Sequence, residues 1–239
     1  IREAGKIEEL KDGKSPLKTH EAKRFGAGFG FRNGEAFEEI VFRPAYHSLT
    51  DDNYGFLRGA EINFLNAAIR HYDDRKKTVL QKFNLVGIKS LSPADEMFMP
   101  VSYAVDVNVG REFNPETGDE GYALNVSAGA GATLALSEEI WIYGMGNSYA
   151  SYGGFLPENY WLGIGAAVGV YADWGRWRFL GEAEKVFATS DLADKIKYKA
   201  EAVYTLNRNN AAALDFVYHQ NQGKNLNEYM LLSLIHISE

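Results

Sequence analysis

Apolar and polar residues alternate one by one along much of the chain after residue 24. In residues 103–112, Tyr103 and the valines at 105, 107 and 109 alternate with polar residues such as Asp106 and Asn108. Successive side chains of a strand point to opposite faces, whereas a helix would scatter both sets around its circumference. The same period of two recurs in residues 37–47, 196–206 and 212–219. The pattern therefore predicts β-strands with one apolar and one polar face.

Clusters of turn-forming residues separate the alternating runs. Arg32-Asn33-Gly34-Glu35 and Thr50-Asp51-Asp52-Asn53 are two of them, and we interpret such clusters as hairpin loops. No βαβ rhythm follows residue 24, so the fold class predicted is all-β, an antiparallel up-and-down transmembrane β-barrel. About 12 strands are expected, near residues 24–33, 36–49, 56–72, 77–90, 99–113, 121–136, 139–152, 159–173, 176–188, 195–206, 211–221 and 226–237.

The length of the strands and the charge on their polar faces favour a membrane barrel with its apolar face outward. Many predicted strands have 11–17 residues, against about 5–6 in most globular sheets. Charges of both signs would then share one lumen, as the polar interior of a membrane barrel allows. The candidate lumen charge network consists of Glu39, Arg43, His47, Glu61, Asp106, Glu182, Lys199 and Glu201.

Aromatic residues gather near the ends of the predicted strands, where membrane barrels carry interfacial girdles. A soluble lipocalin-like barrel with an apolar core stays open as an alternative, because long strands and core aromatics occur there too. The aromatic residues concerned are Tyr46, Tyr54, Phe56, Phe98, Tyr103, Tyr149, Tyr152, Tyr160, Trp161, Trp174 and Trp177.

Composition excludes several kinds of site. The net charge of −7 and pI of about 5.4 give no support for nucleic-acid binding. Cysteine is absent, which removes disulfides, thiolate metal ligands and thiol nucleophiles. The five histidines share no short spacing, so no zinc-hydrolase motif is present and no metal or cofactor is predicted.

The first residues differ from the rest of the chain. Residues 1–23 are rich in Lys and Glu and lack alternation, which predicts a linker from a missing upstream periplasmic domain. The barrel is expected to occupy residues 24–239. No run approaches the 18–20 apolar residues of a membrane helix. The chain starts without Met or a signal-peptide pattern, and we interpret it as a fragment.

An ordered set of short motifs resembles a known family. Phe37-Glu38-Glu39, Phe42-Arg43-Pro44-Ala45-Tyr46-His47-Ser48-Leu49, Gly55, Gly59-Ala60-Glu61-Ile62 and Lys89-Ser90-Leu91-Ser92-Pro93 carry the likeness. The set is similar to the C-terminal region of uncharacterised Gram-negative envelope proteins described as Lnb N-terminal periplasmic domain-containing. The likeness spans roughly residues 16–230. It implies an outer-membrane barrel behind a periplasmic α/β domain, with membrane lipid and that domain as its partners.

The last residues depart from this expectation. Outer-membrane barrels commonly finish on a terminal aromatic residue, whereas residues 231–239 read Leu-Leu-Ser-Leu-Ile-His-Ile-Ser-Glu. This stretch resembles the peptide translated from sequencing-adapter DNA. Two interpretations stay open, a non-native replacement and a genuine apolar strand.

The function predicted from these observations is structural. The barrel is expected in the outer membrane of a Gram-negative bacterium, where it anchors the periplasmic domain with a narrow or plugged lumen and has no enzymatic activity. Alternatives are a small-solute pore, a soluble periplasmic barrel that binds an apolar ligand, and a lipid-acting hydrolase. For the hydrolase, His47 lies beside Ser48, but adjacent strand residues point to opposite faces and no orienting partner is evident.

Overall fold

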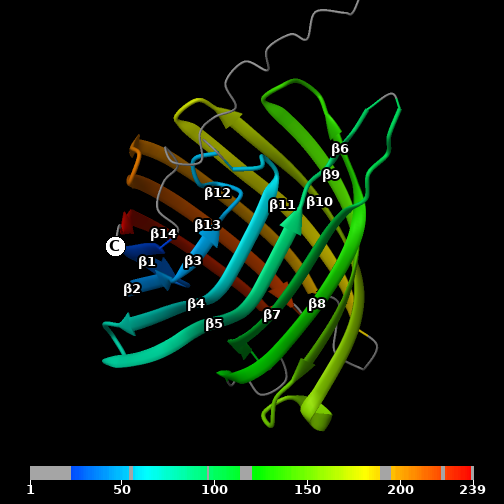
Figure 1. Cartoon of the computed structure of the whole chain (residues 1–239). Coiled ribbons are helices and arrows are strands. Elements are labelled where there is room, and N and C mark those ends of the chain that lie inside the picture. The colour runs from blue at the N-terminus through cyan, green and yellow to red at the C-terminus, as the bar shows by residue number, and fades with distance from the viewer. Residues whose placement is uncertain are drawn as a thin grey trace, which may run out of the picture.

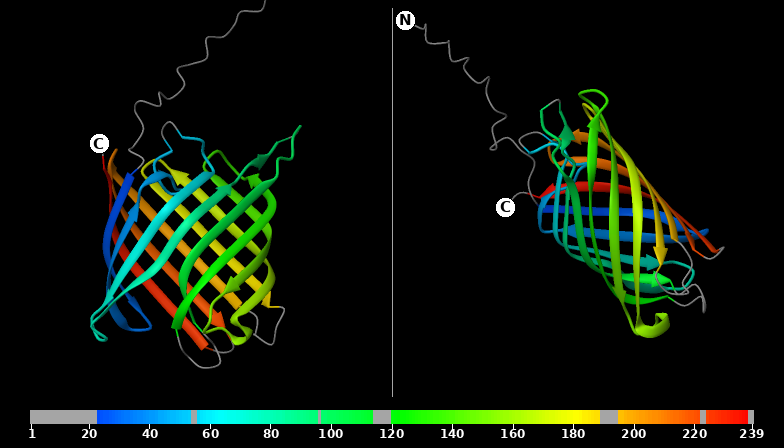
Figure 2. Two further views of the ribbon diagram at one scale, coloured as in Figure 1. Left: turned by 60° about the horizontal axis from the view of Figure 1, so that its bottom comes forward. Right: turned by 90° about the vertical axis from the view of Figure 1, so that its right-hand side faces the viewer.

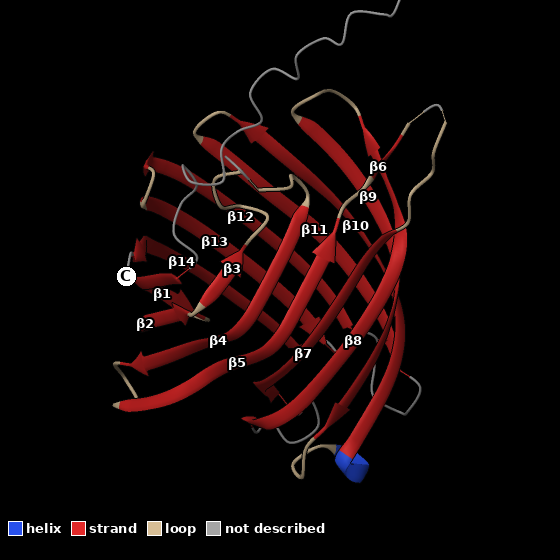
Figure 3. Ribbon diagram, viewed as in Figure 1, coloured by secondary structure: helices blue, strands red, loops and turns tan. Residues whose placement is uncertain are grey.

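A computed structural model describes residues 23–53, 56–95, 97–113, 120–188, 195–221 and 224–237. Nearly all of these residues lie in strands, and the 3₁₀ turn η2 (Pro157–Asn159) precedes β10 (Figure 3). The strands are β1 (Lys23–Arg32), β2 (Glu35–Arg43), β3 (Ala45–His47), β4 (Ala60–Tyr72), β5 (Lys77–Ser90), β6 (Pro93–Ala94), β7 (Ser102–Phe113), β8 (Glu120–Ala135), β9 (Ile140–Tyr152), β10 (Tyr160–Trp174), β11 (Trp177–Ala188), β12 (Lys195–Asn207), β13 (Asn210–Asn221) and β14 (Lys224–Ile237).

Twelve long strands close into one antiparallel barrel (Figure 1). Each long strand pairs with the next one along the chain, and β1 pairs with β14 from Lys23 opposite Ile237 to Arg32 opposite Glu228. The short β3 continues the line of β2 along β4, and β6 pairs with β8 in parallel. The predicted all-β, up-and-down barrel is confirmed.

The hairpins define two ends of the barrel. The terminal end carries the start of β1 and the finish of β14, which lie side by side (Figure 2). At the opposite end, Asn33 and Gly34 have φ angles of 51° and 86°. Two successive positive φ angles are those of a type I′ turn, which matches the right-handed twist of a two-stranded ribbon. The predicted Asn-Gly turn is therefore present.

Strand boundaries agree with the prediction within a few residues, except around the second turn. Residues 36–49 and 56–72 were expected as two long strands, but β2 ends at Arg43, β3 ends at His47 and β4 begins at Ala60. Pro44 separates β2 from β3, since proline has no backbone N–H to donate to a ladder. The residues between β3 and β4 do not form a simple surface hairpin, as the next section describes.

The outer surface of the wall is apolar. On β10, Leu162, Ile164, Val168 and Val170 are exposed, while residues between them face inward. Twelve residues at about 3.3 Å each and a tilt of about 40° cross about 30 Å, enough for the apolar band of a membrane barrel. The face that a soluble barrel would bury is thus turned outward, as in outer-membrane barrels.

Aromatic side chains flank this apolar band at both ends. At the terminal end, Trp177 contacts the rings of Phe179 and Tyr204. At the opposite end, Phe31 contacts Tyr229 across the β1–β14 pair. The prediction was wrong for Trp161, which is buried inside the lumen because it occupies an inward position of β10.

A second aromatic residue was also assigned to the wrong face. Tyr149 donates its hydroxyl to the inward carboxylate of Glu184 instead of facing lipid. Other predicted girdle residues are exposed as expected, among them Phe98, Tyr103, Tyr152, Tyr160 and Trp174. No helix within the described part of the chain has the length and hydropathy needed to cross a membrane.

Two predictions about the ends of the chain concern residues outside the description. The predicted linker lies outside it except for Lys23, which begins β1, as do the final residues 238–239. Residues 231–237 form the second half of β14, which pairs with both β13 and β1. A non-native origin of this stretch stays a prediction, and in this chain the stretch closes the barrel.

Candidate functional site: the lumen and its closing segment

The connection between β3 and β4 folds into the barrel at the terminal end. We call residues Ser48–Asn53 the closing segment. Leu49 and Thr50 are almost completely buried, and the side chain of Asp51 is only 2% exposed. A surface hairpin would leave these residues in solvent. The segment instead fills this end of the lumen, where its contacts reach both walls.

Charged residues of β1, β2 and β4 hold the near side of the segment. Asp51 accepts from Arg24 at 2.6 Å and also pairs with the fully buried Arg43. The backbone N–H of Ser48 donates to the same carboxylate at 2.8 Å. Glu61 of β4 accepts from the backbone N–H of Leu49 at 3.2 Å. These bonds satisfy the Asp51 carboxylate and the backbone N–H groups of Ser48 and Leu49, which lets a polar segment remain inside the barrel.

The far wall holds the other side of the segment. Asn53 donates to the hydroxyl of Tyr171 at 2.6 Å and to Asp173 of β10 at 2.9 Å. Arg178 of β11 pairs with Asp52 at 2.9 Å. The hydroxyl of Thr50 donates to Glu201 of β12. Because β1, β2 and β4 lie across the lumen from β10–β12, these contacts carry the segment across the whole bore.

Apolar packing fixes the centre of the segment. Leu49 belongs to a buried cluster with Leu91, Trp141, Tyr171 and Leu180. The chain then returns to β4 through Gly59, whose φ is +80°, a conformation that L side chains rarely adopt. A Cβ at Gly59 would lie 2.5 Å from the carbonyl oxygen of Leu91 and 2.5 Å from the ring of Trp141. Glycine is thus required at the position directly before β4 begins.

The free space in the barrel is unevenly distributed. Beside Thr50 and Asp52 the cavity measures about 10 Å³, about the volume needed for one water molecule. Beyond the segment, overlapping cavities of about 270, 570 and 560 Å³ reach the β1–β2 turn at Asn33. Among the described residues, the lumen is therefore spacious toward the opposite end and narrow beside the closing segment.

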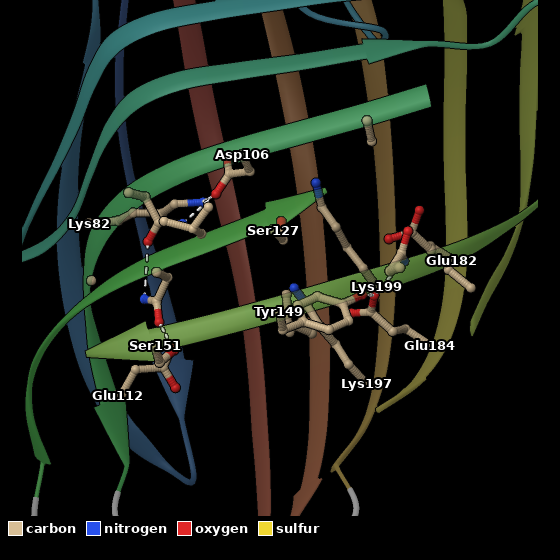
Figure 4. Close-up of a pocket in the computed structure, with 18 of the residues that line it drawn as sticks. Lys82, Asp106, Glu112, Ser127, Tyr149, Ser151, Glu182, Glu184, Lys197 and Lys199 are labelled. Carbon is tan, nitrogen blue, oxygen red and sulfur yellow. Dashed lines mark hydrogen bonds and ion pairs between the residues drawn. The ribbon is translucent and has the colours of Figure 1, made fainter. Parts of the chain in front are cut away.

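Ion pairs cross the middle of the lumen (Figure 4). Lys89 of β5 pairs with Glu182 of β11 at 2.5 Å, and the hydroxyl of Tyr143 donates to the same carboxylate at 2.6 Å. Lys199 pairs with Glu201 of the same strand, β12, at 3.0 Å. In the close-up, Lys82, Asp106, Glu182 and Lys199 all line the same pocket. Most cations facing the cavity are thus neutralised by a neighbouring carboxylate.

A second cluster of charges lies toward the opposite end. Arg70 of β4 contacts Glu39 at 2.7 Å and binds both oxygens of Glu228 at 2.8 Å. Its guanidinium lies 3.7 Å from the ring centroid of Phe37. In the β4–β5 turn, the hydrogen bond to Glu35 raises the pKa of Arg75. The contact of Arg70 with both oxygens of Glu228 is bidentate, which is the strong form of an Arg–carboxylate pair.

All eight residues of the predicted charge network face the lumen, but they belong to separate clusters. Arg43, His47, Glu61 and Glu201 surround or contact the closing segment. Glu39 pairs with Arg70, Glu182 with Lys89, Lys199 with Glu201, and Asp106 lies 3.6 Å from Lys82. A binding role for these residues stays a prediction.

Sequence reasoning missed the partners that make these clusters. Asp51 and Asn53 were interpreted as turn residues, and Arg24 and Arg70 were not predicted to face the lumen. The alternation could have placed Arg70 on the inner face, because its neighbour Ile69 is apolar and lies exposed on the outer face. Nothing in the local pattern indicated that a turn would fold inward.

The hydrolase alternative stays a hypothesis, although the structure gives His47 a candidate orienting partner in Asn53. His47 Nε2 lies 3.1 Å from Asn53 Oδ1, and its ring stacks on Phe56 at 4.4 Å. The hydroxyl of Ser48 lies 3.5 Å from that of Thr50 and 3.4 Å from Glu61. Among the described residues, no group of His, Asp and Glu could hold a metal ion.

Comparison with known families gives one match. A family model described as "Domain of unknown function (DUF7840)" matches residues 13–236. The match does not test the resemblance to the Lnb-type envelope proteins, which stays a prediction. No curated protein sequence matches the chain.

Solved structures with the same fold are outer-membrane barrels. The NanC porin has a TM-score of 0.53 and 8% identity, and the alignment covers 89% of this chain and 100% of the porin. A structure described as a bacterial polysaccharide outer membrane secretin has a TM-score of 0.50 and 8% identity, with coverage of 92% and 100%. At such low identity the likeness concerns the fold alone.

Proposed function

This chain belongs to the DUF7840 family of domains of unknown function, and we propose a function for it from its structure. The chain is an outer-membrane β-barrel that anchors a periplasmic domain, and its own lumen stays closed. The observation that carries this proposal is the closing segment. A pore requires a continuous aqueous path, whereas Leu49, Thr50 and Asp51 lie buried across the bore.

The outer surface supports a place in the membrane. Its apolar band and two groups of aromatic residues match the surface that lipid-facing barrels present. The interior carries paired charges beside separate clusters of buried apolar residues. A soluble barrel that binds an apolar ligand would need the reverse arrangement, so the outward direction of the apolar face favours the membrane.

The ends of the barrel support the anchoring role. The start of β1 and the finish of β14 lie at the same end of the barrel, which is the end that the closing segment occupies. A domain attached before β1 would leave the barrel at that end. We therefore place the closed end on the periplasmic side.

Three measurements on one preparation test the proposal. The chain is produced with a signal peptide and a folded reporter fused before residue 1, and membranes are fractionated. We expect recovery in the outer membrane, a heat-dependent shift on a denaturing gel, and a reporter that protease digests only after the outer membrane is permeabilised. In planar bilayers the purified barrel should show no steady conductance.

Each failure has a distinct meaning. Recovery in the soluble periplasm would overturn the membrane assignment. A reporter digested in intact cells would overturn the periplasmic orientation. Steady channels at every insertion would replace the closed anchor with a small-solute pore, even if localisation and orientation were as expected.

A further inference from the structure

The connection between β5 and β7 exposes an unusual set of apolar side chains. Met97, Phe98, Met99 and Val101 are exposed to 87, 71, 80 and 62%. Contiguous exposed apolar residues mark a contact with a partner or a membrane more often than scattered ones do. We call residues 97–101 the apolar finger.

The finger is held in shape at its base. One carboxylate oxygen of Asp95 accepts from the backbone N–H groups of Met97 at 2.8 Å and Phe98 at 2.6 Å. The N–H of Asp95 donates to the carbonyl of Phe98 at 2.9 Å. An aspartate that bonds the backbone ahead of it forms a compact turn. The apolar side chains are therefore presented by an ordered turn.

A second set of contacts ties the finger to the barrel wall. Pro93 and Ala94, which form β6, pair with the end of β8, and the buried hydroxyls of Ser102 and Thr133 lie 2.7 Å apart. The N–H of Ser92 donates to Ser102 at 3.1 Å. In two views the connection extends past the outline of the wall at the terminal end (Figures 1 and 2).

The finger is continuous with the lipid-facing surface. Tyr103 and Val105 follow it on the outer face of β7, and Leu134 on the neighbouring β8 and Leu136 just after that strand are exposed. We propose that the finger inserts Met97, Phe98 and Met99 into the interfacial layer of the phospholipid leaflet at the terminal end. The inference rests on the proposed membrane barrel.

Lipid fits this surface better than a protein partner does. Residues 97–101 carry no charge or hydrogen-bonding side chain, so they offer apolar contact without polar specificity. Flexible Met and aromatic Phe side chains suit the disordered boundary between headgroups and acyl chains. The acidic Asp95 lies at the base of the turn, where it can remain hydrated.

Single-cysteine labelling tests the placement, since the chain has no native cysteine. Variants F98C and M99C are labelled with an environment-sensitive fluorophore and reconstituted into phosphatidylethanolamine–phosphatidylglycerol vesicles containing nitroxide-labelled lipids. L57C is the matched control, because Leu57 is 77% exposed at the same end. I164C reports the wall, and D74C reports the turn at the opposite end.

We expect labels at 98 and 99 to be quenched severalfold more than those at 57 and 74. Equal quenching at 98, 57 and 74, with strong quenching at 164, would overturn the finger proposal and leave the membrane barrel intact. A blue-shifted label at 98 that neither lipid nitroxide nor aqueous iodide quenches would mean that protein covers the finger. Loss of quenching at 164 would overturn the membrane barrel itself.

Discussion

Substitution of Asp51 by asparagine should release the closing segment. The carboxylate of Asp51 pairs with Arg24 and Arg43 and accepts from the backbone of Ser48. Asparagine keeps the size of the side chain but removes its charge. The two guanidinium groups then lose their shared partner, and the fully buried Arg43 cannot regain solvent while the segment stays docked.

The structure sets the size of this effect. Removal of one partner of a buried ion pair costs about 3–5 kcal/mol. At about 1.4 kcal/mol per tenfold change, the ratio of released to docked segment should rise about 10²-fold to several thousandfold. Asp52 pairs with Arg178 but its side chain is 32% exposed. D52N should therefore have a smaller effect, and D74N in the exposed β4–β5 turn should have almost none.

Two assays measure the release. A cysteine at position 50 is buried in the docked segment, so T50C should react slowly with a maleimide in the parent protein and much faster in the D51N background. In planar bilayers, D51N should show conducting events that the parent and D74N lack. The heat-dependent gel shift must persist, because the β-ladders do not involve the Asp51 side chain.

The reasoning would be refuted by a D51N barrel that keeps its gel shift but shows no release. T50C would then react with the maleimide as slowly as in the D74N background, and the conductance would equal that of D74N. Loss of the gel shift in D51N would mean that the substitution destabilises the whole barrel and not only the docked segment. In that case the double variant D51N/R43Q decides, since it also removes the unpaired charge and should recover part of the lost stability.

The remaining predictions concern stability, each read from denaturant unfolding of the refolded barrel. G59A should destabilise it by more than about 1 kcal/mol, whereas G175A should cost less, because both glycines have positive φ but only Gly59 has close neighbours; equal costs would contradict the steric argument. R70A should cost about 3–5 kcal/mol and R75A at most about 1 kcal/mol, since their side chains are 2% and 47% exposed; similar losses would remove the case for a buried charge cluster. I164R should cost about 2–4 kcal/mol in a lipid bilayer, and a neutral result would argue against a lipid-facing position.

The sequence by itself determined the strands and, for most residues, which of them share a face. A strand alternates its side chains with a fixed period of two, so each alternating run defines an element and sorts its residues by face. Asp106 and Lys199 could be placed on the polar face from their neighbours alone. Local turn chemistry likewise predicted the turn at Asn33 and Gly34. These properties depend on adjacent residues, which a sequence displays directly.

Only the tertiary structure decided what lies across the lumen. The pairs Asp51–Arg24 and Asn53–Asp173 join residues 27 and 120 positions apart, and their contact depends on barrel closure and register. The closing segment contains the same polar residues as a surface turn, so its composition does not separate the two outcomes. It folds inward because a ring of inward charges and a pocket around Leu49 satisfy it there. Those groups meet only once the twelve strands have closed.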